Sequence, residues 1–90
     1  MPLHVFTGPR ESGKTRRLRA RQAELQAQGI EATIITGNAC TTTYLVDRIQ
    51  QQAKAGARYF LADDCTRDQI KAVQSIELPE QFTVYLVRQA

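Results

Sequence analysis

The sequence has no tryptophan, two cysteines and no long hydrophobic run. No apolar stretch approaches the roughly 20 residues that a membrane-spanning helix requires. The stretch Met1–Phe6 is too short and has the wrong flanks for a signal peptide, so we expect a cytoplasmic protein without a membrane partner. Cys40 and Cys65 lie far apart and outside any Cys-x-x-Cys pair, which favours two reduced thiols over a metal centre.

The 90 residues have the composition of an ordinary globular domain, with 42% hydrophobic and 23% charged residues. No long polar or charged tract indicates disorder, and we expect a single domain over residues 1–90. The net charge is only +3, but basic residues concentrate near the N-terminus: Arg10, Lys14, Arg16, Arg17, Arg19 and Arg21. This block has two interpretations, a solvated helix face beside a phosphate site or a surface for nucleic acid.

Apolar, β-rich runs alternate with helix-like stretches along the whole chain. The predicted strands are 3–6, 32–36, 58–62 and 83–87; the predicted helices are 14–28, a stretch from about 41–43 to 55, and a stretch from 66 to about 78. This order predicts right-handed crossovers and a buried parallel sheet with helices on both faces. The expected fold is therefore α/β.

Local signals define the helix ends and the apolar faces. Glycines stop the first two helices, a threonine caps the second, and Thr66 with Gln69 forms a capping box for the third, which Pro79 closes. In the third helix the apolar positions are Ile70, Val73 and Ile76. The first helix has only a narrow apolar side, which consists of Leu18, Ala23, Leu25 and Ala27.

A phosphate-binding motif follows the first predicted strand. Residues 8–15 match G-x-x-x-x-G-K-[ST] at every specified position. The glycines allow successive N–H groups to point at an anion, Lys14 can reach the β- and γ-phosphates, and the Thr15 hydroxyl can bind Mg²⁺. The predicted ligand-binding residues are Gly8, Pro9, Arg10, Glu11, Ser12, Gly13, Lys14, Thr15 and Arg16.

Two acidic residues follow the third predicted strand. In the stretch Tyr59-Phe60-Leu61-Ala62-Asp63-Asp64, the strand is expected to stop at the aspartates. Ligands of open parallel sheets bind at the carboxyl ends of the strands, where the phosphate motif also lies. We expect Asp63, with Thr15, to hold a magnesium ion; the alternative is a turn that caps the next helix.

These two stretches resemble the Walker A and Walker B motifs of the P-loop NTPase superfamily. The resemblance implies a three-layer α/β/α sandwich around a four-stranded parallel sheet. The Asp-Asp pair and the absence of an Asn-Lys-x-Asp motif favour the additional-strand division, with strand order 1-4-3-2, and ATP over GTP. That order would place Arg88 or Gln89 beside the phosphates; Asn38, which follows the second strand, is a further candidate sensor.

The resemblance implies Mg²⁺-dependent binding of a nucleoside triphosphate, with hydrolysis. Lys14 and Asp64 are the candidate catalytic residues, although Asp64 stands where many relatives have glutamate and carries a shorter side chain. The alternatives are a small kinase or phosphotransferase, or a non-catalytic module that uses the basic helix 14–28 to bind nucleotide or nucleic acid.

Strand order 1-4-3-2 would also leave the first strand on an open edge. Such an edge tends to pair, so we expect a homo-oligomer or a partner chain. In such an assembly Arg16, Arg17, Arg19 or Arg21 could reach a neighbour's phosphates as an arginine finger.

Overall fold

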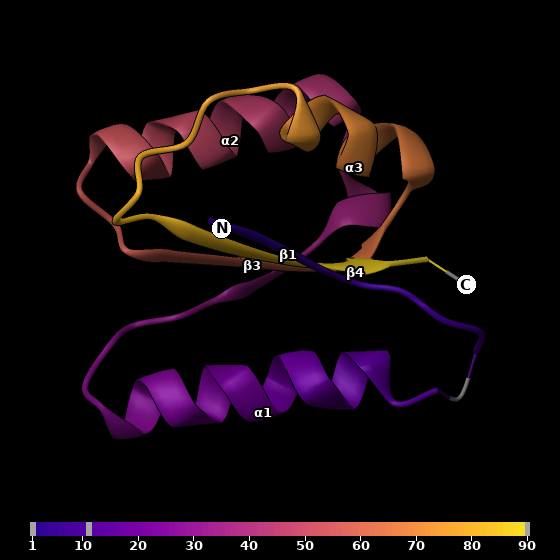
Figure 1. The fold of residues 1–90 in the computed structure, drawn as a ribbon, viewed down its shortest axis with the longest axis horizontal. Coiled ribbons are helices and arrows are strands. Elements are labelled where there is room, and N and C mark those ends of the chain that lie inside the picture. The colour runs from indigo at the N-terminus through magenta and orange to yellow at the C-terminus, as the bar shows by residue number, and fades with distance from the viewer. Residues whose placement is uncertain (1, 11, 90) are drawn as a thin grey trace.

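The computed structural model describes residues 2–10 and 12–89 and contains one sheet of four parallel strands. The strands are β1 (Leu3–Phe6), β2 (Ile34–Thr36), β3 (Tyr59–Cys65) and β4 (Thr83–Arg88), in the order β1-β4-β3-β2. Helix α1 (Lys14–Ala27) covers one face, and α2 (Thr42–Lys54) and α3 (Arg67–Gln74) cover the other (Figure 1). The predicted α/β/α sandwich and its strand order are confirmed.

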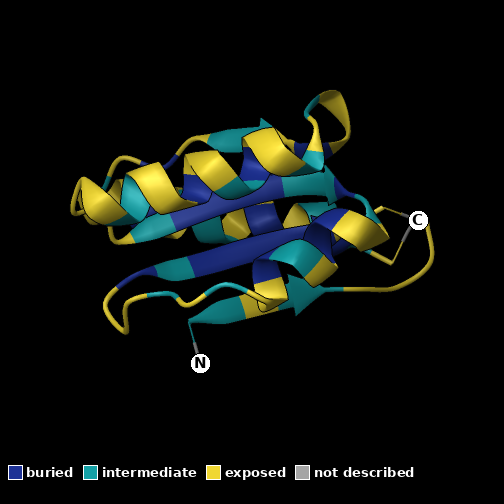
Figure 2. Cartoon of the chain, turned by 90° about the horizontal axis from the view of Figure 1, so that it is seen from above, coloured by how far each residue is buried: buried dark blue, intermediate teal, exposed yellow. Residues whose placement is uncertain are grey.

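The two central strands, β3 and β4, carry the most deeply buried residues (Figure 2). Toward α2 and α3, Phe60, Val84 and Leu86 pack against Leu45 and Ile49 of α2. Burial on both faces explains why β3 and β4 read as continuous apolar runs in the sequence. The strand β2 begins at Ile34, two residues later than predicted, because only residues 34–36 pair with β3.

Helix α1 packs on the sheet through very few apolar residues. Leu18 and Leu25 are fully buried, whereas Ala23 and Ala27 are exposed, so the predicted apolar side was wrong at the two alanines. The contact stripe runs instead through positions 14, 18, 21 and 25, whose spacing of four, three and four keeps them on one helix face. Two of these four positions are basic.

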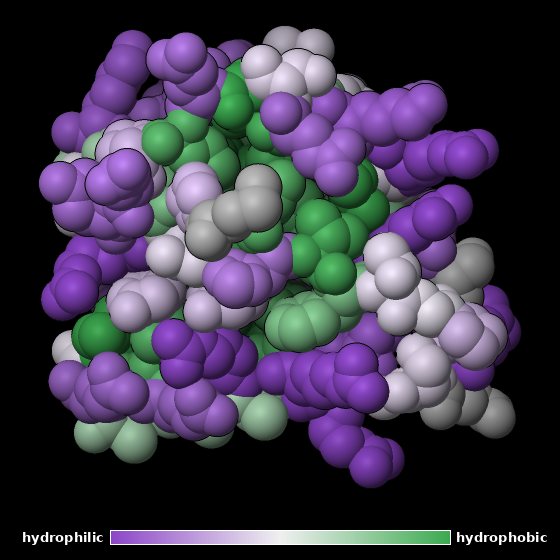
Figure 3. Space-filling model, viewed as in Figure 1, coloured by the Kyte–Doolittle hydropathy of each residue, from purple (hydrophilic) through white to green (hydrophobic). Residues whose placement is uncertain are grey.

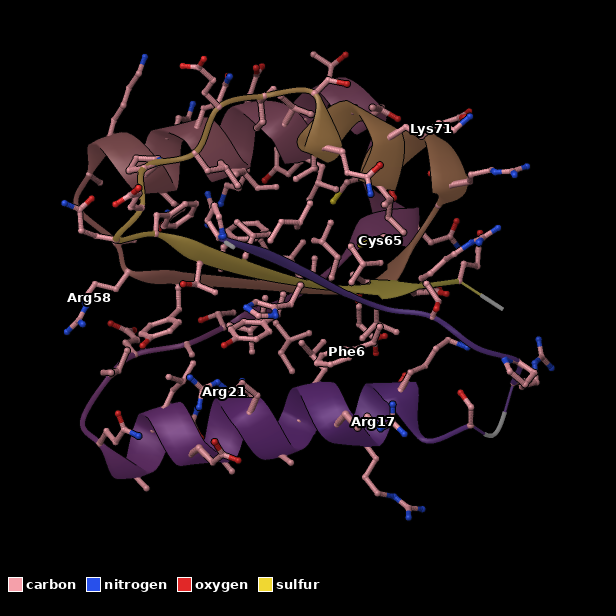
Figure 4. The ribbon with its side chains drawn as sticks, in the orientation of Figure 1. Phe6, Arg17, Arg21, Arg58, Cys65 and Lys71 are labelled. Atoms are coloured by element: carbon pink, nitrogen blue, oxygen red, sulfur yellow. The ribbon has the colours of Figure 1, made fainter. Side chains whose placement is uncertain are left out.

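Arg21 fills the polar gap in that stripe between α1 and the sheet (Figure 4). Its guanidinium carbon lies 5.7 Å from the Tyr59 ring centroid and 5.4 Å from that of Tyr85. Its Nε donates a hydrogen bond to the Tyr85 hydroxyl at 3.1 Å, and its Nη1 pairs with Glu24. Cation–π contacts of this kind attach α1 to the sheet where an apolar side chain would otherwise lie.

The predicted caps of the second and third helices are confirmed. The Thr41 hydroxyl accepts a hydrogen bond from the Tyr44 N–H, and Thr66 and Gln69 form the reciprocal capping box. Helix α3 nevertheless ends at Gln74, so the prediction that it continues to Ile76 was wrong. Ile76 lies in the following loop and still packs against the core, which accounts for its helix-like spacing in the sequence.

A 3₁₀ helix, η1 (Gly37–Ala39), links β2 to α2 and was not predicted. No helix in residues 2–10 and 12–89 is both long enough and apolar enough to cross a bilayer.

Candidate functional site

A polar cavity of about 860 Å³ lies at the carboxyl ends of the central strands. It is bounded by the loop between β1 and α1, the start of α1, η1 and the ends of β3 and β4. Its lining residues are Arg10, Ser12, Gly13, Lys14, Thr15, Arg16, Asn38, Asp63, Asp64, Val87, Arg88 and Gln89. The structure thus brings most of the predicted site residues together; Glu11 lies outside the described residues.

The loop before α1 requires glycine at its two ends for different reasons. Gly8 has φ +143°, and a Cβ there would come within 2.8 Å of the Ser12 Oγ and 3.2 Å of its Cβ. Gly13 has φ +85° and open space around it, so only its backbone conformation demands glycine. The Ser12 N–H donates to the Pro9 carbonyl at 3.2 Å, which folds the loop back on itself.

Lys14 is the first residue of α1, and its side chain is buried under this loop with 8% exposure. Its Nζ donates hydrogen bonds to the carbonyl oxygens of Gly8 at 2.9 Å and Pro9 at 3.3 Å. Among the described residues, no carboxylate lies within ion-pair distance of this ammonium group. A buried cation at the positive end of a helix dipole, with neutral partners, forms a favourable environment for an anion.

Thr15 and Asp63 meet across the cavity, although they are far apart in the sequence. The Thr15 Oγ1 donates to the Asp63 Oδ1 at 3.2 Å. The same carboxylate oxygen accepts the N–H of Asp64 at 2.8 Å, which fixes the orientation of the side chain. A hydroxyl and a carboxylate are oxygen ligands of the kind that Mg²⁺ prefers in nucleotide sites.

Strand β3 does not stop at the aspartates, contrary to the prediction, but runs through them to Cys65. Ala62 pairs with Leu86 and Cys65 with Arg88, so β3 contains one more residue than β4 over this interval. Asp64 adopts φ +54°, an uncommon conformation that aspartate tolerates better than most residues. This bulge breaks the strand alternation, and both aspartates line the cavity.

Three polar side chains from other strand ends complete the cavity. Arg88 is the last residue of β4, Gln89 follows it, and Asn38 lies in η1 after β2. The lining contains four basic residues, at positions 10, 14, 16 and 88, against two aspartates. This excess of positive charge suits a polyanion, and the aspartates provide a place for a metal ion beside it.

The arginines of α1 have different surroundings. Arg16 lines the cavity, and Arg17 and Arg19 are exposed. Arg21 is held by Glu24 and Tyr85, and the hydrogen bond to Glu24, followed by that to Tyr85, raises the pKa of its guanidinium above the usual value. Arg21 thus docks α1 against the sheet, whereas Arg17 and Arg19 are exposed to solvent.

Gln69 of α3 holds the segment from Gly37 to Cys40, which carries Asn38 of the site, and the capping-box pattern did not reveal this role. Its side chain is 1% exposed, and its Nε2 donates to the carbonyls of Gly37 at 2.7 Å and Cys40 at 3.0 Å. Gly37 packs so closely that a Cβ would lie 2.9 Å from the Cys65 Sγ. These contacts fix η1, which carries Asn38, against β3; the sequence signal was only a glycine after a strand.

Cys65 follows the two aspartates at the end of β3 and is fully buried in the core on the side of α2 and α3 (Figure 4). Burial, followed by the nearby carboxylate of Asp63, raises the pKa of this thiol to about 12. The thiol therefore stays neutral and serves as a small apolar group in the core.

Comparison with known proteins assigns no family to the chain. No family model matches it, and no curated protein or solved structure shows significant similarity to it.

Proposed function

We propose that this protein binds a nucleoside triphosphate through its triphosphate group, as the Mg²⁺ complex. Among nucleoside triphosphates, ATP is the preferred candidate. The observation that carries the proposal is the contact between Thr15 and Asp63 at 3.2 Å, next to the buried ammonium group of Lys14. A phosphate cradle, a buried cation and a hydroxyl–carboxylate pair in one polar cavity match the requirements of a metal–triphosphate ligand.

Each residue has a role in this proposal. The N–H groups of the loop and of the first turn of α1 bind the β- and γ-phosphates, and Lys14 neutralises part of their charge. Thr15 and Asp63 would hold Mg²⁺, and the donor set of a hydroxyl and a carboxylate fits that ion. The ion supplies additional positive charge along the phosphate chain.

Hydrolysis is the second part of the proposal. Asp64 lines the cavity next to Asp63, and its αL backbone conformation directs it there instead of to the opposite face of the sheet. In this proposal Asp64 acts as the general base that orients the attacking water. Arg88 supplies a positive charge near the γ-phosphate, where negative charge develops during transfer.

A thermal-denaturation panel tests the binding proposal. ATP, GTP and their diphosphates are added with and without Mg²⁺ to the wild type and to Asp63→Asn. At 100 times its Kd a ligand adds about 2.7 kcal/mol, which raises the Tm of a domain this small by about 10–20 °C. We expect the largest shift with ATP and Mg²⁺, and a loss of the magnesium dependence in Asp63→Asn. Equal Tm values with and without every nucleotide would refute the proposal.

Phosphate release tests the second part. We expect Asp64→Asn to keep the Mg²⁺·ATP affinity but to lower turnover by about 10²–10⁴-fold, the usual contribution of a general base. Turnover equal to that of the wild type would exclude Asp64 from the reaction.

A further inference from the structure

Strand β1 forms an open edge of the sheet, next to β4 alone. The Val84 N–H donates to the Pro2 carbonyl at 2.6 Å, and Leu3 lies opposite Val84. In a parallel ladder, alternate residues direct their backbone groups to the same neighbour. His4 and Phe6 therefore face β4, and the N–H and C=O groups of Leu3 and Val5 point away from it, toward the open edge.

An apolar groove of about 550 Å³ runs along this edge. Pro2, Leu3 and Val5 line one side of it; Val73 of α3 and Ile76 and Leu78 of the next loop line the other. Figure 3, viewed toward the β1 edge, shows apolar side chains gathered between β1 and the layer of α2 and α3, with hydrophilic residues around them. Backbone groups and apolar side chains are thus both available to an added strand.

The opposite edge of the sheet is better protected against pairing. Strand β2 has only three residues, and charged side chains line the cavity beside it: Glu31, Arg48 and Arg58. Strand β1 contains no charged residue, and its register with β4 runs without a bulge. Short strands, charges and bulges are the usual protections of a sheet edge, and β1 lacks the last two.

The charges at the two ends of this edge are opposite in sign. At the carboxyl end of β1, Arg67, Lys71 and Arg88 line a smaller cavity that also includes Val5. At the amino end, Glu77 and Glu80 lie in the exposed loop whose residues Ile76 and Leu78 form the groove. A second copy that runs antiparallel brings the basic end of each chain to the acidic end of the other, which makes the edge complementary to itself.

We propose that two copies of this chain pair antiparallel through β1 and form one continuous eight-stranded sheet. One register pairs every outward group of β1: Leu3 of each copy lies opposite Val5 of the other, and His4 lies on the two-fold axis opposite its own copy. Leu3 and Val5 exchange N–H···O=C bonds in both directions, which gives four bonds across the interface. Their side chains share the face of α2 and α3 and cover the grooves of both copies.

This arrangement differs from an arginine-finger assembly. In an antiparallel pair the carboxyl ends of the two β1 strands point in opposite directions. The two β1–α1 loops therefore lie on opposite sides of the interface, and each copy keeps its own phosphate cavity. Dimerisation and nucleotide binding are therefore separate properties that can be measured separately.

The decisive experiment uses charge at position 4, where the two copies meet. His4 is exposed, and it stacks on Tyr85 on the face of the sheet that α1 covers. In the proposed ladder the two His4 residues form a non-hydrogen-bonded pair, in which the side chains of the two copies lie close together. Sedimentation equilibrium should give a wild-type mass of twice 10.1 kDa. Like charges directly opposite each other oppose pairing, so the Kd of the dimer should rise about fivefold or more in His4→Glu and in His4→Lys.

A mixture of the two charged variants supplies the rescue. We expect the His4→Glu and His4→Lys chains to form a heterodimer at least as tight as the wild-type dimer, and the neutral control His4→Gln to remain dimeric. Circular dichroism and the Tm of each variant verify that the chain is folded. A wild-type chain that stays monomeric at high concentration, charged variants that dimerise like the wild type, or a mixture no tighter than its components would each overturn the proposed interface.

Discussion

Replacing Gly8 with alanine should damage the proposed phosphate-binding loop, residues 8–13, in two separable ways. The residue has φ +143°, a region that only glycine adopts readily, and this strain costs about 1–3 kcal/mol of stability. In addition, the new methyl group would lie 2.8 Å from the Ser12 Oγ and 3.2 Å from its Cβ, so the loop must shift. Because the Gly8 carbonyl anchors the Lys14 ammonium, the shift moves the cation as well. We expect the Kd for Mg²⁺·ATP to rise at least tenfold, which is about 1.4 kcal/mol.

Gly29 provides the matched control for backbone strain. It also has a positive φ, of +79°, but it follows α1 and has open space around its Cβ position. Gly29→Ala should therefore lower stability by about 1–2 kcal/mol and leave nucleotide affinity unchanged. Urea denaturation and titration calorimetry on the same samples separate the two effects.

The steric part can be isolated with Ser12→Gly, which removes both contacting atoms. In a double-mutant cycle, Gly8→Ala and Ser12→Gly should show a coupling free energy of about 0.5–3 kcal/mol, in the direction of rescue. An unchanged affinity in a folded Gly8→Ala protein would refute the idea that this loop geometry binds the ligand. Additive effects in the cycle would refute the predicted clash.

Three further predictions concern the support of the site. Gln69→Ala leaves the buried Gly37 carbonyl without its hydrogen-bond donor and should lower the free energy of unfolding, measured by urea denaturation, by about 2–3 kcal/mol. A decrease of less than about 0.5 kcal/mol would contradict this role. Arg21→Ala removes the contacts with Tyr85 and should cost about 1 kcal/mol, with Arg21→Met recovering only the packing part; equal stability of all three proteins would contradict it. Folding raises the pKa of Cys65 from 9.0 to about 12, so above pH 9 the thiol ionises in the unfolded chain before it ionises in the folded one. The free energy of unfolding is therefore unaffected by this group below pH 9 and falls above it, by about 1.4 kcal/mol at pH 10. Cys65→Ala should show a correspondingly weaker alkaline loss of stability, and identical slopes would contradict this.

Much of the fold could be predicted from the sequence because its signals are local and agree with one another. The capping box at Thr66, the glycine after each of the first two helices and the apolar runs of β3 and β4 each act within a few residues. The strand order came from the Asp-Asp pair and a missing guanine motif, and the structure confirms it.

The features that the sequence did not predict depend on contacts between distant residues. The contact of Arg21 with Tyr85 forms only once the sheet is in place, so the sequence indicated Ala23 and Ala27 as part of the α1 contact face in its stead. The bulge at Asp64 depends on the register between β3 and β4, which no local pattern encodes. The second role of Gln69 likewise depends on the position of η1 relative to α3.

The candidate site likewise has one part that local sequence signals predicted and one part that depends on the three-dimensional structure. The motif at 8–15 and the acid at Asp63 were predicted residue by residue. The structure places Arg10, the residues Ser12–Thr15 and Asp63 around one cavity, and the carbonyl groups of Gly8 and Pro9 hold Lys14 there. The αL conformation of Asp64, which directs its side chain into that cavity, emerges only from the three-dimensional arrangement.

Titration calorimetry of Mg²⁺·ATP with the wild type, Lys14→Ala and Lys71→Ala tests the central claim most directly. Lys14 is the buried cation of the loop, and Lys71 is an exposed lysine on α3 that serves as the control for loss of one positive charge. A charge-assisted contact to phosphate predicts that Lys14→Ala weakens binding by about 100-fold, while Lys71→Ala changes it by less than about twofold. Equal affinities of the wild type and a folded Lys14→Ala protein would contradict the proposed phosphate site.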